Sequence, residues 1–222
     1  MIILRERRTN GSWKRIFVNA IIAIVVIGAI WGLIIANQPE PSYGPASPLL
    51  AEMCANQFGR LPQDAQINAC TDVIKAGHLS DEKLAAAYFL RGLALKAQGK
   101  NEKALVDFSE SIRLNQGDDE VLRLRGDQFY LQHDYDLAIQ DYDQAIRLNP
   151  NNASAYNNRA LAYATKRDYD HAIADYDQAV QLEPTNAMML MNRGLAKLKN
   201  GDEPGGNADL ANAKKLGAQI SR

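Results

Sequence analysis

The sequence predicts an all-α protein in which one N-terminal transmembrane helix precedes a solenoid of helical hairpins. Two observations predict this fold class. Residues 16–36 contain no charged side chain, and about 20 apolar residues are what a helix needs to cross a bilayer. From residue 85 to about residue 220, small and aromatic residues recur every 34 residues, a period typical of stacked pairs of helices.

The charge distribution sets the expected orientation of the chain. Residues 1–15 carry five basic residues and one acidic residue, and because the whole chain has a net charge of −1, the remainder carries −5. A basic flank favours a cytoplasmic N-terminus. We therefore expect a single-pass inner-membrane protein whose residues 37–222 lie in the periplasm. The acidic remainder argues against nucleic acid as a partner, since nucleic acid needs a basic face.

Two alternatives to a retained anchor at 16–36 are a cleaved signal and a buried helix of a soluble domain. A signal has an apolar core of about 7–15 residues and a small-x-small cleavage site. Here the apolar run is longer, and the candidate cleavage site has Ile34 where a small residue is required. A buried soluble helix rarely lacks charges for so long. We expect the segment to span the membrane and to remain attached.

Residues 37–48 predict an extended linker. This segment contains Pro39, Pro41, Pro45 and Pro48, and prolines at this density prevent a helix and favour a polyproline-type spacer. The linker is expected to hold the following domain away from the bilayer.

Residues 49–84 predict a helical hairpin that carries both cysteines of the chain. Gly59 and Pro62 mark a turn between helices expected at 49–58 and 65–76. Cys54 and Cys70 are equally far from residue 62, so they are expected at the same height on facing helices, where a disulfide is feasible. A compartment beyond the membrane is oxidising enough for one. Two buried apolar thiols are the alternative.

Residues 85–222 form the repeat domain, with registers at 85–118, 119–152, 153–186 and 187–220. Each register predicts two antiparallel helices, here called helix A and helix B. A small residue at position 8 lets helix A approach helix B, and the large residue at position 24 fills the space between small residues at positions 20 and 27. Position 8 is Gly92, Gly126, Ala160 and Gly194, and position 24 is Phe108, Tyr142, Tyr176 and Leu210.

Two segments carry a family resemblance. The sequences Asp-Tyr-Asp-Leu-Ala-Ile from Asp134 and Asp-Tyr-Asp-His-Ala-Ile from Asp168 are followed by Pro150 and Pro184, and they resemble the tetratricopeptide-repeat (TPR) consensus. The resemblance covers residues 85–220. With the cysteine-bearing hairpin in front, it is similar to the membrane-anchored bacterial envelope type. It implies a right-handed superhelix whose inner groove, lined by the A helices, binds an extended peptide or a helix of a protein partner.

The last repeat departs from the pattern. Pro204, Gly205 and Gly206 stand where helix B is expected to begin. The sequence therefore predicts a late start for this helix, near Asn207, and a last helix that exposes part of its apolar face.

An Arg at position 7 and an Asp at position 23 recur in every repeat, which suggests structural ion pairs. An Arg at this helix interface is partly buried and needs an acceptor. Solvated faces are the alternative, and the sequence leaves open whether a pair closes within one repeat or between two. If Arg125 meets Asp141, Arg125→Leu is expected to be better tolerated than Asp141→Ala. The residues are Arg91, Asp107, Arg125, Asp141, Arg159, Asp175, Arg193 and Asp209.

The resemblance also selects the candidate partner-binding residues, which occupy the helix A positions that face the groove in TPR domains. Aromatic and Arg residues usually dominate interfaces, so Arg123 and Tyr130 are the best single candidates. The full set is Phe89, Arg123, Asp127, Tyr130, Asn157, Asn158, Met188 and Met191.

No motif indicates an enzyme. The sequence has no His/Cys/Asp cluster with metal-ligand spacing and no Gly-rich phosphate loop or nucleophile elbow, so no catalytic residue, metal or cofactor is expected. The favoured function is a membrane-tethered protein-interaction adaptor or scaffold in cell-envelope assembly or secretion. The alternatives are a self-associating structural protein, in which the last helix pairs with another copy, and an accessory subunit of a respiratory or cytochrome-maturation complex.

Overall fold

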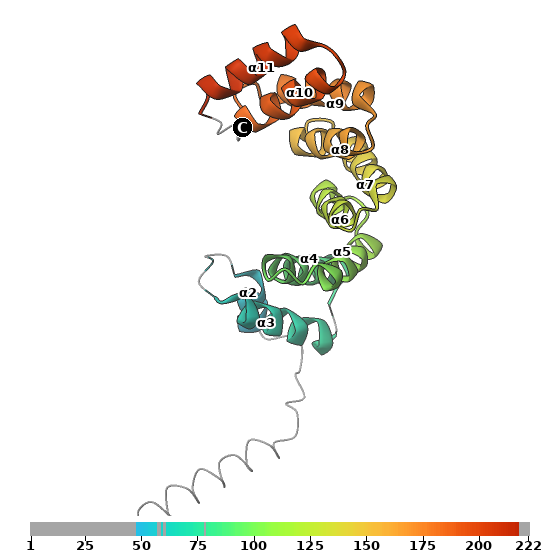
Figure 1. Cartoon of the computed structure of the whole chain (residues 1–222). Coiled ribbons are helices and arrows are strands. Elements are labelled where there is room, and N and C mark those ends of the chain that lie inside the picture. Colours follow the sequence, from blue (N-terminus) through green and yellow to red (C-terminus); the bar gives the residue numbers. More distant parts are fainter. Residues whose placement is uncertain (1–47, 57–58, 60, 78, 218–222) are drawn as a thin grey trace, which may run out of the picture. The chain divides into compact units, whose positions relative to one another are not determined.

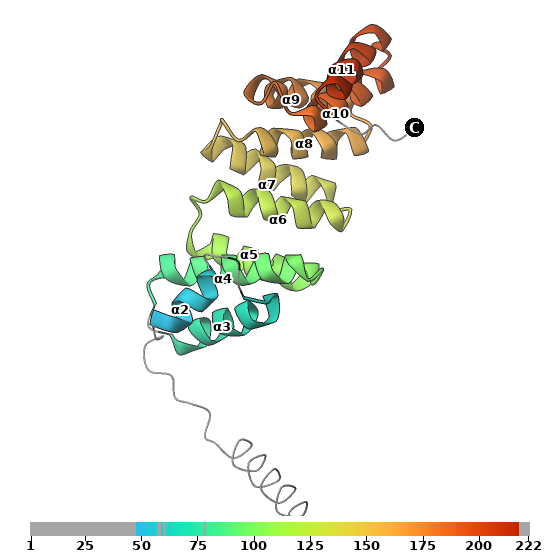
Figure 2. The ribbon, with the colours of Figure 1, turned by 90° about the vertical axis from the view of Figure 1, so that its left-hand side faces the viewer.

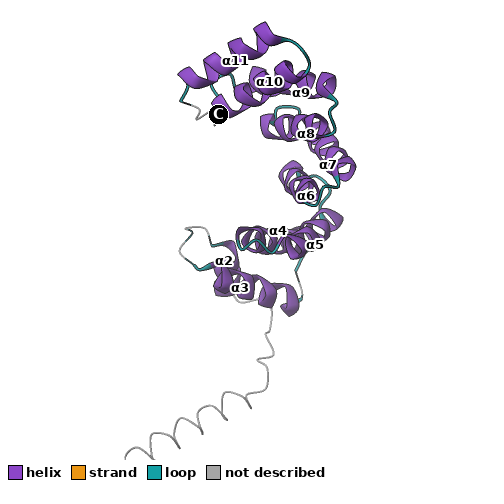
Figure 3. Cartoon of the chain, viewed as in Figure 1, coloured by secondary structure: helices purple, strands orange, loops and turns teal. Residues whose placement is uncertain are grey.

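The computed structural model describes residues 48–217 of the chain, except residues 57, 58, 60 and 78. This described part consists of ten helices and contains no strand (Figure 3). The helices are α2 Pro48–Ala55, α3 Gln63–Ala76, α4 Asp81–Ala97, α5 Asn101–Leu114, α6 Asp119–Leu131, α7 Tyr135–Leu148, α8 Ala153–Thr165, α9 Tyr169–Leu182, α10 Ala187–Lys199 and α11 Glu203–Lys215. None of them has the length and apolar character to cross a membrane. The expected transmembrane helix at 16–36 and residues 37–47 of the expected linker lie outside the described residues and stay predictions. Pro48, expected to end the linker, is instead the first residue of α2, where its missing N–H removes no intrahelical hydrogen bond.

The helices after α3 form four antiparallel pairs, one for each 34-residue repeat. Helix α4 pairs with α5, α6 with α7, α8 with α9, and α10 with α11. Each helix B also packs against helix A of the following repeat. Helices α4, α6 and α8 therefore lie along one side of the stack and α5, α7 and α9 along the other (Figure 1). Figure 2 shows the pairs stacked in chain order. The predicted solenoid of helical hairpins is confirmed.

Glycine at repeat position 8 allows close contact between helix A and helix B. A Cβ atom on Gly126 would lie 2.7 Å from Cε1 of Tyr142, and one on Gly92 would lie 2.7 Å from Cε1 of Phe108. Both rings are fully buried. Because packed interiors leave no room for an added methyl group at such a distance, the small and aromatic positions have the packing role that the sequence predicts.

The first repeat has a longer helix A than its register suggests. Helix α4 begins at Asp81, one turn before residue 85, because the hydroxyl of Ser80 accepts a hydrogen bond from the backbone N–H of Lys83. The later A helices begin at position 1 of their registers, after the capping residues Asp118, Asn152 and Asn186. Such side-chain acceptors satisfy N–H groups that have no partner within the helix.

The expectation of a late start for the last helix is wrong, because α11 begins at Glu203 rather than near Asn207. The carboxylate of Asp202 accepts a hydrogen bond from the backbone N–H of Gly205 and caps the helix. Pro204 lies in the first turn, where its missing N–H removes no intrahelical hydrogen bond.

The glycines of this segment also have a packing role. A Cβ atom on Gly206 would lie 2.8 Å from the carbonyl oxygen of Gly194 on α10. Glycine at both positions therefore allows the backbones of α10 and α11 to approach closely at the start of α11.

Helices α2 and α3 form the hairpin in front of the repeats. Cys54 and Cys70 are joined by a disulfide with their Cα atoms 4.6 Å apart, and both residues are buried. Around them pack Ala69, Val73 and Ala87, the last from α4. The hairpin thus has a small core of its own that continues onto the first repeat.

Candidate functional site

The four Arg–Asp pairs close within each repeat, from helix A to helix B. In every repeat the Arg donates through Nε and Nη2 to the two carboxylate oxygens of the Asp sixteen residues later, over 2.6–2.8 Å. The four Asp residues are buried, so this two-point geometry satisfies a group that would otherwise be costly inside the protein. The pairs are Arg91–Asp107, Arg125–Asp141, Arg159–Asp175 and Arg193–Asp209.

Two of these Arg residues also bridge to the preceding repeat. Nη1 of Arg159 donates to Asp143 over 2.5 Å, and Nη1 of Arg193 donates to Asp177 over 2.9 Å. Burial alone would lower the pKa of Arg159, but hydrogen bonds to the two carboxylates outweigh burial and raise it. The pairs therefore stabilise both the repeat and the junction between repeats, which gives them a structural role.

The side of the stack formed by α4, α6, α8 and α10, here called the A-helix face, contains two pockets of about 260 Å³ each. The Tyr142 pocket is lined by Lys96, Asp127, Tyr130, Leu131, Tyr142, Asn158 and Leu161. The Tyr176 pocket is lined by Leu161, Ala164, Thr165, Tyr169, Tyr176, Asn192, Leu195, Ala196 and Lys199. Six members of the first set recur in the second after a shift of 34 residues, so one pocket is the repeat-translated counterpart of the other. Leu161 belongs to both.

The two pockets differ in the partner of the tyrosine. The hydroxyl of Tyr142 donates to Asp127 over 3.0 Å. At the position of Asp127 the next repeat has Leu161, and among the described residues the hydroxyl of Tyr176 has no hydrogen-bond partner. Burial raises the pKa of both tyrosines, so both hydroxyls stay protonated and can donate. The Tyr176 pocket therefore offers a hydrogen-bond donor that the fold itself does not use.

A chain of side-chain amides links the two pockets. Asn192 donates to Asn157 over 3.0 Å, Asn157 donates to Asn158 over 3.0 Å, and Asn158 donates to Asp127 over 2.8 Å. These residues come from α10, α8 and α6, so the chain crosses three repeats. It places polar groups between two apolar-walled pockets, an arrangement suited to an extended peptide whose backbone needs hydrogen bonds.

Asp127 is the centre of this polar surface. Besides Tyr142 and Asn158, its carboxylate accepts from Lys96 over 3.5 Å and from Arg123 over 3.1 Å. Arg123 also pairs with Glu120. Burial would lower the pKa of Arg123, but Glu120 and Asp127 outweigh burial and raise it. Arg123 thus holds Asp127 in place and does not line either pocket.

The remaining candidate residues divide into three groups. Tyr130 lines the Tyr142 pocket, and its hydroxyl is 3.0 Å from Oγ1 of Thr165 on α8. Phe89 and Met191 are half-buried and pack against the core clusters of their repeats, rather than standing open for a partner. Met188 is 56% exposed at the start of α10 but lines neither pocket.

Sequence reasoning assigned Tyr176 to the core and left Leu161, Leu195 and Asn192 out of the candidate set. The sequence did contain an indication that Tyr176 borders a pocket. Repeat 1 has Phe108 at the same position, and the additional hydroxyl of a tyrosine on a buried ring needs a polar or open environment. Among the described residues no group of three or more His, Cys, Asp or Glu side chains could hold a metal ion.

The helical pairs, their 34-residue period and the A-helix face define a helical-repeat protein. Family models described as "Tetratricopeptide repeat" match residues 85–118 and 153–186, and one described as "TPR repeat" matches residues 126–167. The chain therefore contains tetratricopeptide repeats. No curated protein sequence matches it.

Solved structures share the fold. MamA (residues 41 to the end) from Desulfovibrio magneticus RS-1 aligns with a TM-score of 0.70 at 17% identity, over 78% of this chain and 96% of that one. YrrB, described as a TPR protein with an unusual peptide-binding site, aligns with a TM-score of 0.66 at 16% identity, over 85% and 92%. The TPR domain of Arabidopsis OM64 aligns with a TM-score of 0.52 at 24% identity, over 53% and 98%. At these identities the likeness extends to the fold alone.

Proposed function

We propose that this chain is a membrane-tethered adaptor whose A-helix face binds an extended peptide of a partner protein. A TPR array is a protein-interaction scaffold, and the observation that carries the proposal is the pair of equivalent pockets joined by the amide chain. Two apolar side chains of a peptide would enter the Tyr142 and Tyr176 pockets, and the amides would bond the peptide backbone between them. The peptide-binding description of YrrB supports this class of ligand.

The membrane tether and the cellular setting belong to the same proposal. The charge-free segment 16–36 and its basic flank support one membrane-spanning helix with the repeats in the periplasm. Such an adaptor would serve envelope assembly or secretion, and nothing in the described residues indicates catalysis.

Leu161→Asp tests the A-helix face, because Leu161 belongs to both pockets. Leu161 is 36% exposed, so a carboxylate at this position can reach water and the variant is expected to fold. A crosslinkable amino acid at Leu195 first identifies the partner in the native membrane. The variant should then weaken the affinity for that partner at least tenfold, about 1.4 kcal/mol.

The matched control is Leu137→Asp, which introduces the same charge on α7, on the other side of the stack, where Leu137 is 43% exposed. This control should bind normally. Equal binding by the wild type and Leu161→Asp would move the site away from the A-helix face. A large loss of stability in Leu161→Asp would show instead that Leu161 is a packing residue.

The tether is tested by N-terminal sequencing of the protein from the membrane fraction. Because the apolar run is long and ends at an unsuitable cleavage site, the mature chain should retain residues 16–36. A mature chain that begins near Asn37 would contradict the tether and favour a cleaved signal.

A further inference from the structure

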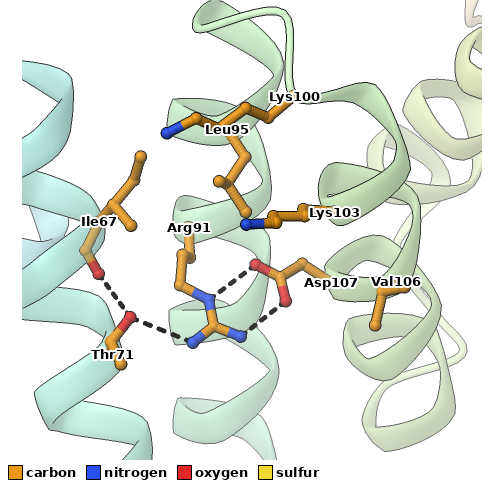
Figure 4. Close-up of a pocket in the computed structure, with 8 residues that line it drawn as sticks. All are labelled: Ile67, Thr71, Arg91, Leu95, Lys100, Lys103, Val106 and Asp107. Carbon is orange, nitrogen blue, oxygen red and sulfur yellow. Dashed lines mark hydrogen bonds and ion pairs between the residues drawn. The ribbon is translucent and has the colours of Figure 1, made fainter.

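A third cavity, of about 340 Å³, lies where the cysteine hairpin meets the first repeat, between α3, α4 and α5. We call it the hairpin pocket. Its apolar lining comes from Ile67, Leu95 and Val106, and its charged lining from Arg91, Lys100, Lys103 and Asp107, with Thr71 completing the wall. Figure 4 shows the ammonium groups of Lys100 and Lys103 directed toward the space between the helices.

The positive charges of the hairpin pocket exceed the negative ones. Asp107 is occupied by Arg91, which donates to both of its oxygens over 2.8 and 2.7 Å. Lys100 and Lys103 form no ion pair with any residue that the structure describes. Neither acidic residue of α3, Asp64 or Asp72, lines the pocket, and Asp64 accepts a hydrogen bond from Gln98. Two lysine charges beside an apolar wall are therefore left for a ligand.

These lysines break the repeat pattern. Position 16 is Lys100 in the first repeat but Asp134, Asp168 and Asp202 in the others. Position 19 is Lys103 in the first repeat, where the others have Leu137, His171 and Gly205. On the neighbouring helix α3, Nη1 of Arg91 donates to the hydroxyl of Thr71 rather than to an acid. Arg159 and Arg193 donate to Asp side chains of the preceding repeat, whereas Arg125 has no such acceptor among the described residues. The two lysines are thus the charges that are specific to this junction.

Both lysines are also unfavourable for the helix that carries them. Lys100 occupies the N-cap of α5, and as an ammonium group it cannot accept a capping hydrogen bond. Asp168 and Asp202 cap α9 and α11, whereas Asp134 before α7 makes no capping hydrogen bond. Cations near a helix N-terminus oppose the helix dipole. Residues that weaken a local structure without a compensating contact are expected at functional sites, and an anion bound here would offset both effects.

We propose that the hairpin pocket binds a peptide carboxylate flanked by an aliphatic side chain, from a protein partner. The carboxylate would pair with Lys100 and Lys103, and the aliphatic group would contact Ile67, Leu95 and Val106. A C-terminal carboxylate and an Asp or Glu side chain offer this same chemistry. The site lies outside the A-helix face, so it does not depend on the function proposed above.

Three short peptides test the proposal by NMR titration of the full-length chain. N-acetyl-Ser-Leu-Val with a free C-terminus supplies an α-carboxylate, its C-terminal amide supplies none, and N-acetyl-Glu-Leu-Val amide supplies a side-chain carboxylate. At least one of the two acids should shift the backbone resonances of Lys100, Lys103 and Val106, and the amide without a carboxylate should not. The acid that binds more tightly identifies the source of the carboxylate.

The decisive variant is Lys100→Asp/Lys103→Leu, which installs the residues that repeat 2 carries at these positions. It should lose at least tenfold in affinity for the acidic peptide while its melting temperature stays equal or rises. The control Lys214→Asp/Lys215→Leu makes the same charge change on α11 and should bind normally.

Several outcomes would overturn the proposal. These are the absence of binding by either acid, equal binding by wild type and the Lys100→Asp/Lys103→Leu variant, and equal loss in the α11 control. Binding of phosphatidylglycerol vesicles through the same lysines, with no peptide binding, would assign the pocket to a membrane surface and contradict a peptide ligand.

Discussion

The Arg125–Asp141 pair shows how exposure decides which partner is more costly to remove. The side chain of Asp141 is 6% exposed, whereas that of Arg125 is 21% exposed. Both hydrogen bonds to the Asp141 carboxylate within the described part of the chain come from Arg125. Without its partner, Asp141 would be a buried unpaired charge, while Arg125 would still reach water.

We therefore expect Arg125→Leu to destabilise the protein by about 3 kcal/mol and Asp141→Ala by about 1 kcal/mol. This order reverses the one that the sequence suggests, in which Leu restores an apolar residue at position 7. Chemical denaturation of both variants measures the difference. The double variant should be more stable than Arg125→Leu alone, and a smaller loss in Arg125→Leu than in Asp141→Ala would contradict the argument.

Gln128 is a second residue whose environment is unusual. It is fully buried on α6, and neither atom of its side-chain amide has a hydrogen-bond partner among the described residues. The other repeats have Ala94, Ala162 and Ala196 at this position. Leaving a buried amide unpaired costs about 1–3 kcal/mol.

Gln128→Met keeps the volume of the side chain and removes the amide, so it should raise the free energy of unfolding by about 1 kcal/mol. Gln140→Met, at an exposed position of α7, is the control and should change little. Thermal and urea denaturation give both values. A loss of stability in Gln128→Met would mean that the amide has a partner, such as an ordered water.

At the scale of the helices, the junction between the first and second repeats lacks one ion pair. Position 25 of the repeat, which lies on helix B, is Asp143 in the second repeat and Asp177 in the third. Each accepts a hydrogen bond from the Arg of the next repeat. In the first repeat this position is Ser109, whose hydroxyl donates to the backbone of its own helix. Arg125 consequently has no acceptor from the preceding repeat in the described structure.

Ser109→Asp should supply the missing acceptor and raise the free energy of unfolding by up to about 1 kcal/mol. The gain should shrink at high salt, because the new pair is partly exposed. Ser109→Asn, which has a similar shape and no charge, is the control. If the Asp and Asn variants melt at the same temperature at low salt, the junction gains nothing from an ion pair at this position.

The helices and their pairing were predictable because they depend on residues that recur with the period. Gly126 and Tyr142 are close in one hairpin, so position 8 and position 24 predict their contact. The polar surface was not predictable in this way, since the partners of Asp127 come from α4, α6, α7 and α8. The contacts from Lys96 and Asn158 depend on the rotation between repeats, which no local pattern encodes, whereas those from Arg123 and Tyr142 form within one hairpin. For the same reason the sequence could not show that Leu161 belongs to two pockets.

At the scale of the whole molecule, the exposed side of α11 decides between a monomeric adaptor and self-association through the last helix. Its exposed residues are Glu203, Pro204, Asn207, Ala208, Ala211, Asn212, Lys214 and Lys215. Beside these small and polar residues, the large apolar side chain exposed at this end is Leu216, which is 46% exposed at the C-cap. Among the residues that the structure describes from Glu203 to Gly217, the expected exposure of an apolar face is therefore limited to one large side chain. Scattered apolar residues are normal on monomers.

Residues 44–222, which form a separate compact unit, should accordingly sediment as a monomer. A stable dimer buries about 800 Å² on each partner around an apolar centre, and α11 offers no such centre. Sedimentation velocity over a range of protein concentrations measures the mass. If a dimer forms, Leu216→Asp distinguishes its cause: a dimer that this variant abolishes would establish pairing through the last helix and support the self-associating alternative. A dimer that persists in Leu216→Asp would contradict the monomer and would direct attention to the A-helix face, where Leu161, Leu195 and Met188 are also exposed.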